Sequence, residues 1–179
     1  MILPKTTERR DIPYKYSHEV TSQLGFSAML RSFRDIPGCH NINNFFAGKS
    51  ILDVGCGSGS DLIRFRRLGA AAVGTDINVT RKDLPITPGR AGALPFPSDQ
   101  FDVVFAKFLL DIIPLKELEA FPREAHRVLK AGDHLIYFGL VWDERQKIFT
   151  ASARQAGFQA RHIKDTHPLY LFEKSAVPG

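Results

Sequence analysis

The residues from Asp53 to Gly59 combine a carboxylate with a run of alternating glycines. The stretch reads Asp53-Val-Gly-Cys-Gly-Ser-Gly59 and follows the apolar pair Ile51 and Leu52. Glycine adopts backbone conformations that are closed to other residues, and it lets a ligand approach the main chain. The helix expected after the loop would direct its unpaired amides and its positive dipole end at such a ligand. We therefore expect a buried strand, a ligand-binding loop and a helix.

The spacing of the glycines distinguishes two kinds of nucleotide site. A dinucleotide fingerprint requires G-x-G-x-x-G, with a pyrophosphate at the helix terminus. The third glycine would fall at Ser60 or at Leu62, depending on the register, so neither register fits. The carboxylate of Asp53 would also repel a pyrophosphate. It suits a ligand that carries an ammonium group and a second positive centre.

A second acidic residue, Asp76, ends the next apolar run, Ala71–Thr75. It lies about twenty residues beyond the glycine loop, which is the separation expected of an acid that binds ribose hydroxyls in a βαβ unit. An ordinary acid at a strand end is the alternative. The glycine loop before it favours ribose binding.

Four stretches, in order, resemble the class I S-adenosylmethionine-dependent methyltransferases. The glycine loop is similar to the first motif of that family, and Gly74-Thr75-Asp76 to the end of its second strand. Ala93-Leu-Pro-Phe-Pro-Ser-Asp-Gln-Phe-Asp-Val-Val104 resembles its "LPF, acid, FD, apolar pair" signature. Arg127-Val-Leu-Lys-Ala-Gly-Asp133 resembles its "RVLKPGG" turn, with Ala131 and Asp133 as departures. These motifs cover roughly residues 49–140.

The resemblance implies an α/β fold: a Rossmann-like, doubly wound sandwich with a seven-stranded, mostly parallel sheet. The implied strand order is 3-2-1-4-5-7-6, with a C-terminal antiparallel hairpin. It also implies S-adenosylmethionine as the cofactor and S-adenosylhomocysteine as the product. The residues expected at the cofactor are Asp53, Gly55, Cys56, Gly57, Asp76, Ile77, Ala91, Gly92, Ala93 and Lys107.

Residues 77–92 depart from the family pattern. Pro85, Pro88 and Gly89 argue against a full helix there, so we expect a shortened third strand and a shortened helix before it. Arg90 stands where the family usually has an acid beside the adenine. Main-chain atoms of Ala91 and Gly92 could bind the adenine instead, while Arg90 could bind an anionic part of a substrate or point outward.

The expected fourth strand, Phe101–Ala106, is followed by a mostly apolar segment whose polar members are Lys107 and Asp111. Ligands in open α/β sheets bind outside the carboxyl ends of the strands, so this segment should border the transferred methyl group. The two residues either form an ion pair or face the ligand crevice, because an unpaired buried charge is costly. Asp111 and His18 are the candidate catalytic bases.

Three aromatic residues are candidates for contact with the substrate: Tyr14, Tyr16 and Trp142. The first two belong to an N-terminal segment, and relatives often use that segment to cover the site. Plain packing is the alternative for each. We divide the chain into a capping arm and helix, residues 1–48, and a methyltransferase domain, residues 49–179.

Several element boundaries follow from periodicity and from helix-breaking residues. Leu62, Phe65 and Leu68 predict a helix that ends at Gly69. Pro122 is expected to divide two helical stripes, the first with Leu115, Leu118 and Phe121 and the second with Ala125, Val128 and Leu129. Gly132 should then end the second stripe before a strand over 133–141. A helix over 146–156 and paired strands at 158–164 and 169–174 complete the chain.

Composition limits the remaining possibilities. The 179 residues carry 24 Lys and Arg against 19 Asp and Glu, a formal charge of +5. This excess is compatible with an anionic partner but is ordinary for a globular protein, and nucleic acid is not expected. Two cysteines indicate neither a disulfide framework nor a metal site. With no signal-type or membrane-spanning run, we expect a cytoplasmic monomer or homodimer with no membrane partner.

The sequence therefore predicts a methyltransferase that modifies a small molecule, in specialised metabolism. Two alternatives remain open. One is methylation of RNA or protein, which the positive charge favours. The other is a non-catalytic partner subunit with the same fold, which the contracted segment 77–92 and Arg90 favour.

Overall fold

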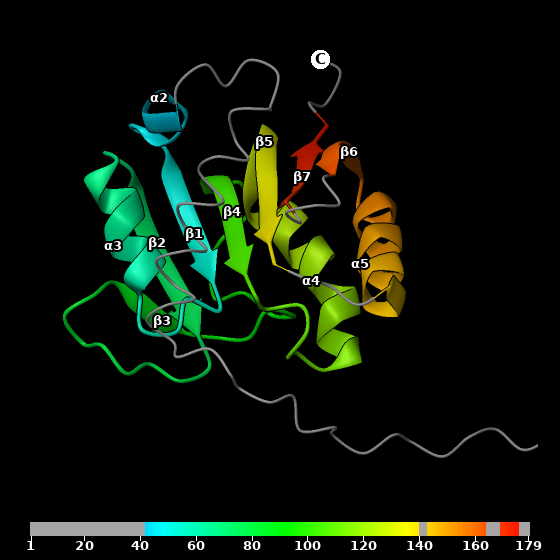
Figure 1. Ribbon diagram of the computed structural model, residues 1–179, viewed down its shortest axis with the longest axis horizontal. Coiled ribbons are helices and arrows are strands. Elements are labelled where there is room, and N and C mark those ends of the chain that lie inside the picture. The colour runs from blue at the N-terminus through cyan, green and yellow to red at the C-terminus, as the bar shows by residue number, and fades with distance from the viewer. Residues whose placement is uncertain (1–41, 140–142, 164–168, 176–179) are drawn as a thin grey trace, which may run out of the picture.

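Seven strands form one sheet between two layers of helices in the computed structural model, which describes residues 42–139, 143–163 and 169–175 (Figure 1). The strands are β1 (Ser50–Val54), β2 (Ala71–Asp76), β3 (Ile86–Pro88), β4 (Phe101–Lys107), β5 (Leu129–Phe138), β6 (Phe158–Ile163) and β7 (Leu169–Lys174). Their order is β3-β2-β1-β4-β5-β7-β6. Strands β1 to β5 pair in parallel, whereas β7 is antiparallel to both β5 and β6. The predicted topology, including the antiparallel hairpin, is confirmed.

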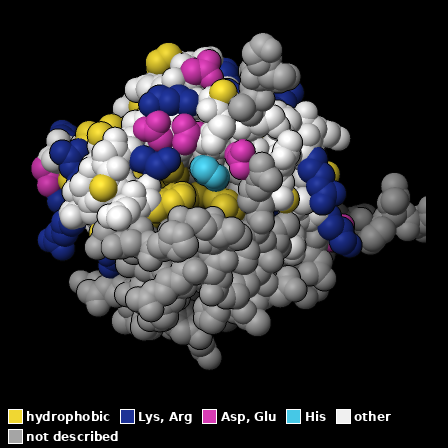
Figure 2. Space-filling model, turned by 90° about the horizontal axis from the view of Figure 1, so that it is seen from above, with side chains coloured by type: hydrophobic (Ala, Val, Ile, Leu, Met, Phe, Trp, Pro, Cys, Tyr) yellow, Lys and Arg dark blue, Asp and Glu magenta, His cyan; other side chains and the backbone are white. Residues whose placement is uncertain are grey.

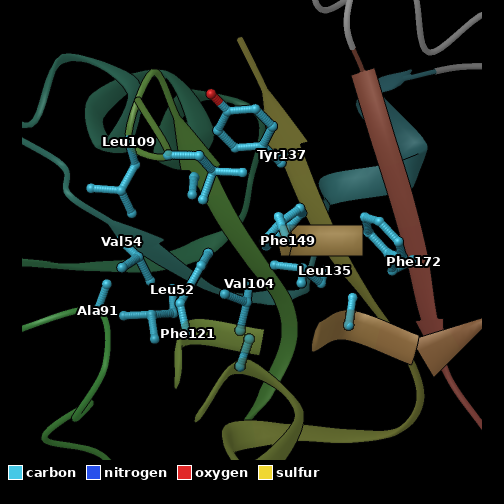
Figure 3. Packing of buried hydrophobic residues seen from close by; sticks show 14 of the residues in the cluster. Leu52, Val54, Ala91, Val104, Leu109, Phe121, Leu135, Tyr137, Phe149 and Phe172 are labelled. Carbon is cyan, nitrogen blue, oxygen red and sulfur yellow. The ribbon is translucent and has the colours of Figure 1, made fainter. Parts of the chain in front are cut away.

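The strands are apolar on both sides, and alternate residues belong to two separate cores. Leu52, Val104 and Leu135 pack with the helices α4 (Leu115–Val128) and α5 (Asp143–Gln155), as Figure 3 shows for part of this cluster. Their neighbours Ile51, Val103 and Ile136 pack on the opposite face with α2 (Ile42–Phe46) and α3 (Ser60–Arg67). A parallel sheet covered on both faces needs such continuous apolar strands. Because successive side chains of a strand point to opposite faces, each strand contributes alternate residues to the two cores of this three-layer sandwich.

The segment between β2 and β3 is contracted, as predicted. Residues 77–85 contain no helix, and β3 has 3 residues. Proline occupies both Pro85, just before the strand, and Pro88, its last residue. Because proline lacks an amide donor, it is tolerated at such an edge and not in a central strand.

Helix α4 runs without interruption through Pro122, contrary to the expectation of a break there. Proline removes one intrahelical hydrogen bond and is unfavourable inside a helix. Leu118, Phe121, Ala125 and Val128 are all fully buried on one face of this helix. Burial of that continuous face outweighs the local cost, since most helical stability in proteins comes from packing.

Strand β5 begins earlier than predicted, directly after α4. Leu129 pairs with Phe101, the register then shifts, and His134 pairs with Val103. Gly132 lies inside this irregularity at φ 81° and does not end a helix before the strand. A bulge of this kind accommodates extra residues in one strand, and glycine supplies the left-handed conformation it needs. The expected start at residue 133 missed the segment before the bulge.

The segment after β3 is bonded to α4 by the guanidinium of Arg127. This contact joins the motif at 93–104 to the motif at 127–133. Arg127 donates to the carbonyls of Phe96 (Nη1, 2.7 Å) and Leu94 (Nη2, 3.0 Å). It also forms a two-point ion pair with Glu124, whose carboxylate accepts the amide of Leu94 at 2.7 Å. We call these contacts the Glu124–Arg127 clamp. Two-point bonds of this kind are among the stronger hydrogen bonds in proteins.

Candidate active site

The glycine loop crosses the carboxyl end of β1 and is bonded to the end of β2. The amides of Gly55 and Cys56 both donate to the carbonyl of Thr75, at 2.8 Å and 3.2 Å. Gly55, Gly57 and Gly59 all have positive φ, at 71°, 53° and 73°. A Cβ on Gly57 would have no heavy atom within 4 Å, whereas one on Gly59 would meet Leu84 at 2.5 Å. Gly57 therefore borders open space where a ligand can approach the main chain.

Asp53 is the penultimate residue of β1 and is 2% exposed. Its Oδ2 atom is buried and has no hydrogen-bond partner among the described residues. Burial is the main cause that raises the pKa of Asp53 well above its ordinary value; Asp61 and Asp76 raise it further and Lys107 lowers it. An unpartnered buried carboxylate is costly. A cationic ligand group placed here would remove that cost.

Lys107, the last residue of β4, forms an ion pair with Asp61 and not with Asp111. The side chains of Lys107 and Asp61 are only 11% and 9% exposed, respectively. Asp61 lies in the first turn of α3, where the helix dipole favours a carboxylate, and it also accepts Nη1 of Arg64 at 2.9 Å. The Lys107–Asp111 ion pair, one of the two alternatives left open by the sequence, is not the pair observed, because β4 and β1 are neighbours and this brings Lys107 to the start of α3.

Asp76 lies beside the glycine loop and accepts two main-chain amides. Its Oδ2 bonds to the amide of Gly57 and its Oδ1 to the amide of Asn78, both at 2.9 Å. Each carboxylate oxygen has two acceptor sites, so both can still accept from a pair of vicinal hydroxyls. The next residue, Ile77, is 62% exposed and offers an apolar surface beside this acid. That surface suits the face of a nucleobase.

The segment 90–93 differs in environment along its length. Arg90 bonds to Glu117 of α4 (Nη1 to Oε1, 2.6 Å), and its side chain is 64% exposed. It therefore lies at the surface, paired with an acid of the protein itself. Ala91 is buried in the core beneath α4. Gly92 packs against α4, where a Cβ would lie 3.3 Å from Cβ of Ala120. Ala93 donates its amide to the carbonyl of Arg90 at 3.1 Å.

Residues 108–113, which we call the β4–α4 loop, begin in a strained conformation. Phe108 has φ 52°, which is rare for a bulky side chain and is typical of functional sites. Leu109 of this loop lies over the glycine loop, since a Cβ on Gly55 would meet its Cδ1 at 2.6 Å. Asp111 is half-buried and lies near the phenol of Tyr137. Burial, followed by the Asp111 charge, raises the pKa of Tyr137.

Cys56 carries a free thiol that is turned toward β2. A Cβ on Gly74 would lie 2.6 Å from its Sγ, so the thiol packs on the main chain of that strand. Burial raises the pKa of the Cys56 thiol, and the charges of Asp53 and Asp76 raise it further. The thiol is therefore protonated at neutral pH, and the residue contributes to the loop through its backbone.

Among the predicted site residues, the structure gathers Asp53, Gly55, Cys56, Gly57, Asp76, Ile77 and Lys107 at the carboxyl ends of β1, β2 and β4. His18, Tyr14, Tyr16 and Trp142 lie outside the described residues. Sequence reasoning missed Asp61. An acid in the first helical turn and a lone lysine ending a neighbouring buried strand were the available signal.

The described residues contain no group of histidine, cysteine and acidic side chains that could bind a metal ion. Nor does any described helix combine the length and the apolar character that a membrane crossing requires. The donor set at the carboxyl edge instead consists of carboxylates and main-chain amides. It fits a ligand with an ammonium group, a ribose and a positively charged centre, as S-adenosylmethionine has.

Residues 52–137 match the methyltransferase domain family. The demethylmenaquinone methyltransferase of Tropheryma whipplei is 34% identical over 102 residues, which are 50% of this chain and 41% of that protein. The ribosomal protein L11 methyltransferase of Bacillus cereus is 28% identical over 129 residues, 65% of this chain and 39% of that protein. The chain thus spans about two fifths of the length of these curated relatives.

The fold has solved counterparts. A SAM-dependent methyltransferase of Methanosarcina mazei superposes with a TM-score of 0.60 at 17% identity, covering 73% of this chain and 94% of the other. The observed strand order, the glycine loop ending β1 and the acid ending β2 agree with the family match over residues 52–137. Residues 52–137 of the chain therefore match a methyltransferase domain, in a fold shared with a solved SAM-dependent methyltransferase.

Proposed function

We propose that this protein transfers the methyl group of S-adenosylmethionine to a small apolar acceptor. The observation that carries the donor half of the proposal is the buried, unpartnered carboxylate of Asp53 beside the open main chain of Gly57. Asp53 would accept the ammonium of the methionine part, and Asp76 the ribose hydroxyls. The bound cofactor supplies a methyl group on a positively charged sulfur, which is already a good leaving group.

The chain's own contribution is then mainly to align the acceptor, since displacement at such a centre depends on orientation. The β4–α4 loop follows the strand end that borders the site, and two of its side chains are exposed apolar groups, Phe108 (39%) and Ile112 (70%). Leu115, at the start of α4, is exposed as well. Apolar surface of this kind favours an uncharged acceptor. Asp111 is our candidate for accepting the acceptor's proton.

Nucleic acid is the weaker alternative, because cations at this edge are paired with acids. Lys107 is bonded to Asp61 and Arg90 to Glu117. Figure 2 shows the opposite end of the sheet, where the parallel strands begin, and there too basic and acidic side chains of the described residues lie next to one another. A phosphate backbone is instead recognised by a patch of unpaired cations. Cytoplasmic location and a covering role for residues 1–48 remain predictions.

The acceptor of the Tropheryma whipplei relative suggests the first probe. Methyl transfer from labelled S-adenosylmethionine would be measured with a water-soluble demethylmenaquinol, with ribosomal protein L11 and with bulk RNA. We expect incorporation into the quinol alone. Incorporation into L11 or RNA only would replace the acceptor half of the proposal. The donor half would be contradicted if calorimetry detected binding of neither S-adenosylmethionine nor S-adenosylhomocysteine.

A further inference from the structure

The β4–α4 loop is fastened from outside by a residue of α5. Arg145, in the first turn of that helix, donates Nε to the carbonyl of Leu110 at 2.7 Å. Its Nη2 donates to the carbonyl of Ile113. Within the described part of the chain Arg145 forms no ion pair, so both bonds of the guanidinium serve this loop. One planar cation thereby fixes two points three residues apart.

These bonds satisfy the main-chain carbonyls of two buried residues. Leu110 is fully buried and Ile113 is 9% exposed. The amides of Ile112 and Ile113 both turn back to the carbonyl of Leu109, at 3.1 Å and 3.3 Å. The carbonyls of Leu110 and Ile113 instead accept from Arg145 of α5. A buried carbonyl without a partner is strongly disfavoured. Removal of the Arg145 guanidinium would therefore release the loop.

The loop contacts both halves of the proposed site. On one side Leu109 covers Gly55 of the glycine loop. On the other, the Leu110 main chain and the Asp111 carboxylate lie close to the Tyr137 phenol. Figure 3 shows the Tyr137 phenol oxygen on the side of the sheet where Leu109 lies. A shift of the loop would displace Asp111 and the exposed apolar side chains together.

We propose that Arg145 is a positioning residue, which holds the β4–α4 loop in the conformation that aligns the acceptor. This inference rests on the proposed function for the loop's role, but the fastening itself can be tested without any acceptor. Arg145 touches neither the glycine loop nor Asp76 in the contacts above. Its effect on catalysis would pass through the loop.

The test is hydrogen–deuterium exchange of the full chain, comparing wild type with Arg145→Met and Arg145→Lys. Arg154→Met is the matched control, because Arg154 lies on the same helix and is exposed. We expect amides of 109–113 to exchange at least about tenfold faster in Arg145→Met, since two charge-assisted bonds are lost. Arg145→Lys, which keeps the cation but not the two-point geometry, should fall between. The control should match wild type.

Unchanged exchange of 109–113 in Arg145→Met would overturn the inference. So would an equal increase throughout α5 and β5, because that pattern means general destabilisation. In the transfer assay, Arg145→Met should raise the KM for demethylmenaquinol at least about fivefold with the KM for S-adenosylmethionine within twofold, and Arg145→Lys should recover part of the loss. If wild type transfers no methyl group, the proposed function fails while the exchange result still decides the role of Arg145.

Discussion

Replacing Asp53 by Asn should stabilise the free protein and weaken its binding of S-adenosylmethionine. The carboxylate is 2% exposed, and its Oδ2 has no partner among the described residues. Burial first, and then the charges of Asp61 and Asp76, raise its pKa well above the ordinary value. The ionised group therefore opposes folding when no cation is bound. An amide of nearly the same shape removes the charge but keeps an oxygen in place.

The size of both effects follows from the environment of this side chain. An unsatisfied buried group costs about 1–3 kcal/mol and more when it is charged, so we take about 2 kcal/mol as the gain in unfolding free energy from removal of the charge. For a chain of 179 residues that gain raises Tm by about 4–8 °C. A hydrogen bond to a charged group contributes about 1.5–3 kcal/mol, so its loss should weaken cofactor binding by about 10- to 150-fold.

The gain in unfolding free energy of Asp53→Asn over wild type should depend on pH. Because the folded-state pKa of Asp53 is raised, ionisation destabilises the fold fully above that pKa, and the penalty disappears as the pH falls below the unfolded value. The advantage of Asp53→Asn over wild type should therefore be largest at neutral and alkaline pH. It should shrink on acidification.

The assay pairs thermal unfolding with calorimetric titration of S-adenosylmethionine, and Asp102→Asn is the control. Partial burial raises the pKa of Asp102, but bonds from Lys130 and Ser50 outweigh this and lower it from 3.8 to about 2. Asp102 therefore stabilises the fold above pH 4, and this contribution is lost as the pH falls toward 2. The control should lower Tm at neutral pH and leave binding intact. A loss of stability in Asp53→Asn, or binding within threefold of wild type, would refute the reasoning.

Three further substitutions test other parts of the site. Lys107→Met removes one of the two cations bonded to the Asp61 carboxylate and leaves Arg64 in place, so it should lower the unfolding free energy in urea by about 1.5–3 kcal/mol; an unchanged midpoint would contradict the buried pair. Gly57→Ala and Gly132→Ala place a Cβ in open space at positive φ, so both should lose about 1 kcal/mol, but only Gly57→Ala should abolish calorimetric binding of S-adenosylmethionine. Arg127→Met breaks the Glu124–Arg127 clamp, and its cost of about 2–4 kcal/mol in urea unfolding should far exceed that of removing an exposed arginine.

The first two strands and the glycine loop between them were predictable from local signals, whereas the sheet order was implied by the resemblance to the methyltransferases. Apolar runs that end in Asp53 and Asp76, with glycines between them, define strands, turns and the edge where ligands bind. The contracted segment before β3 was predictable from its prolines. Each of these features is written in a few adjacent residues.

What the sequence did not reveal depends on contacts between distant residues. Lys107 could be paired with Asp61 only after the neighbouring strands β1 and β4 were placed side by side. The uninterrupted α4 depends on a buried face whose benefit exceeds the local cost of Pro122, and local preference alone cannot weigh the two. Arg145 gives no signal, because its partners are main-chain carbonyls, which every residue has.

The Glu124–Arg127 clamp has a consequence for engineering this scaffold. It grips the segment at 94–96 through main-chain carbonyls and an amide, so it is indifferent to the side chains there. A library that varied the exposed positions 97 and 98 while retaining the two clamp residues and the buried Leu94 would keep the attachment. The fold thus separates how this stretch is anchored from what it displays.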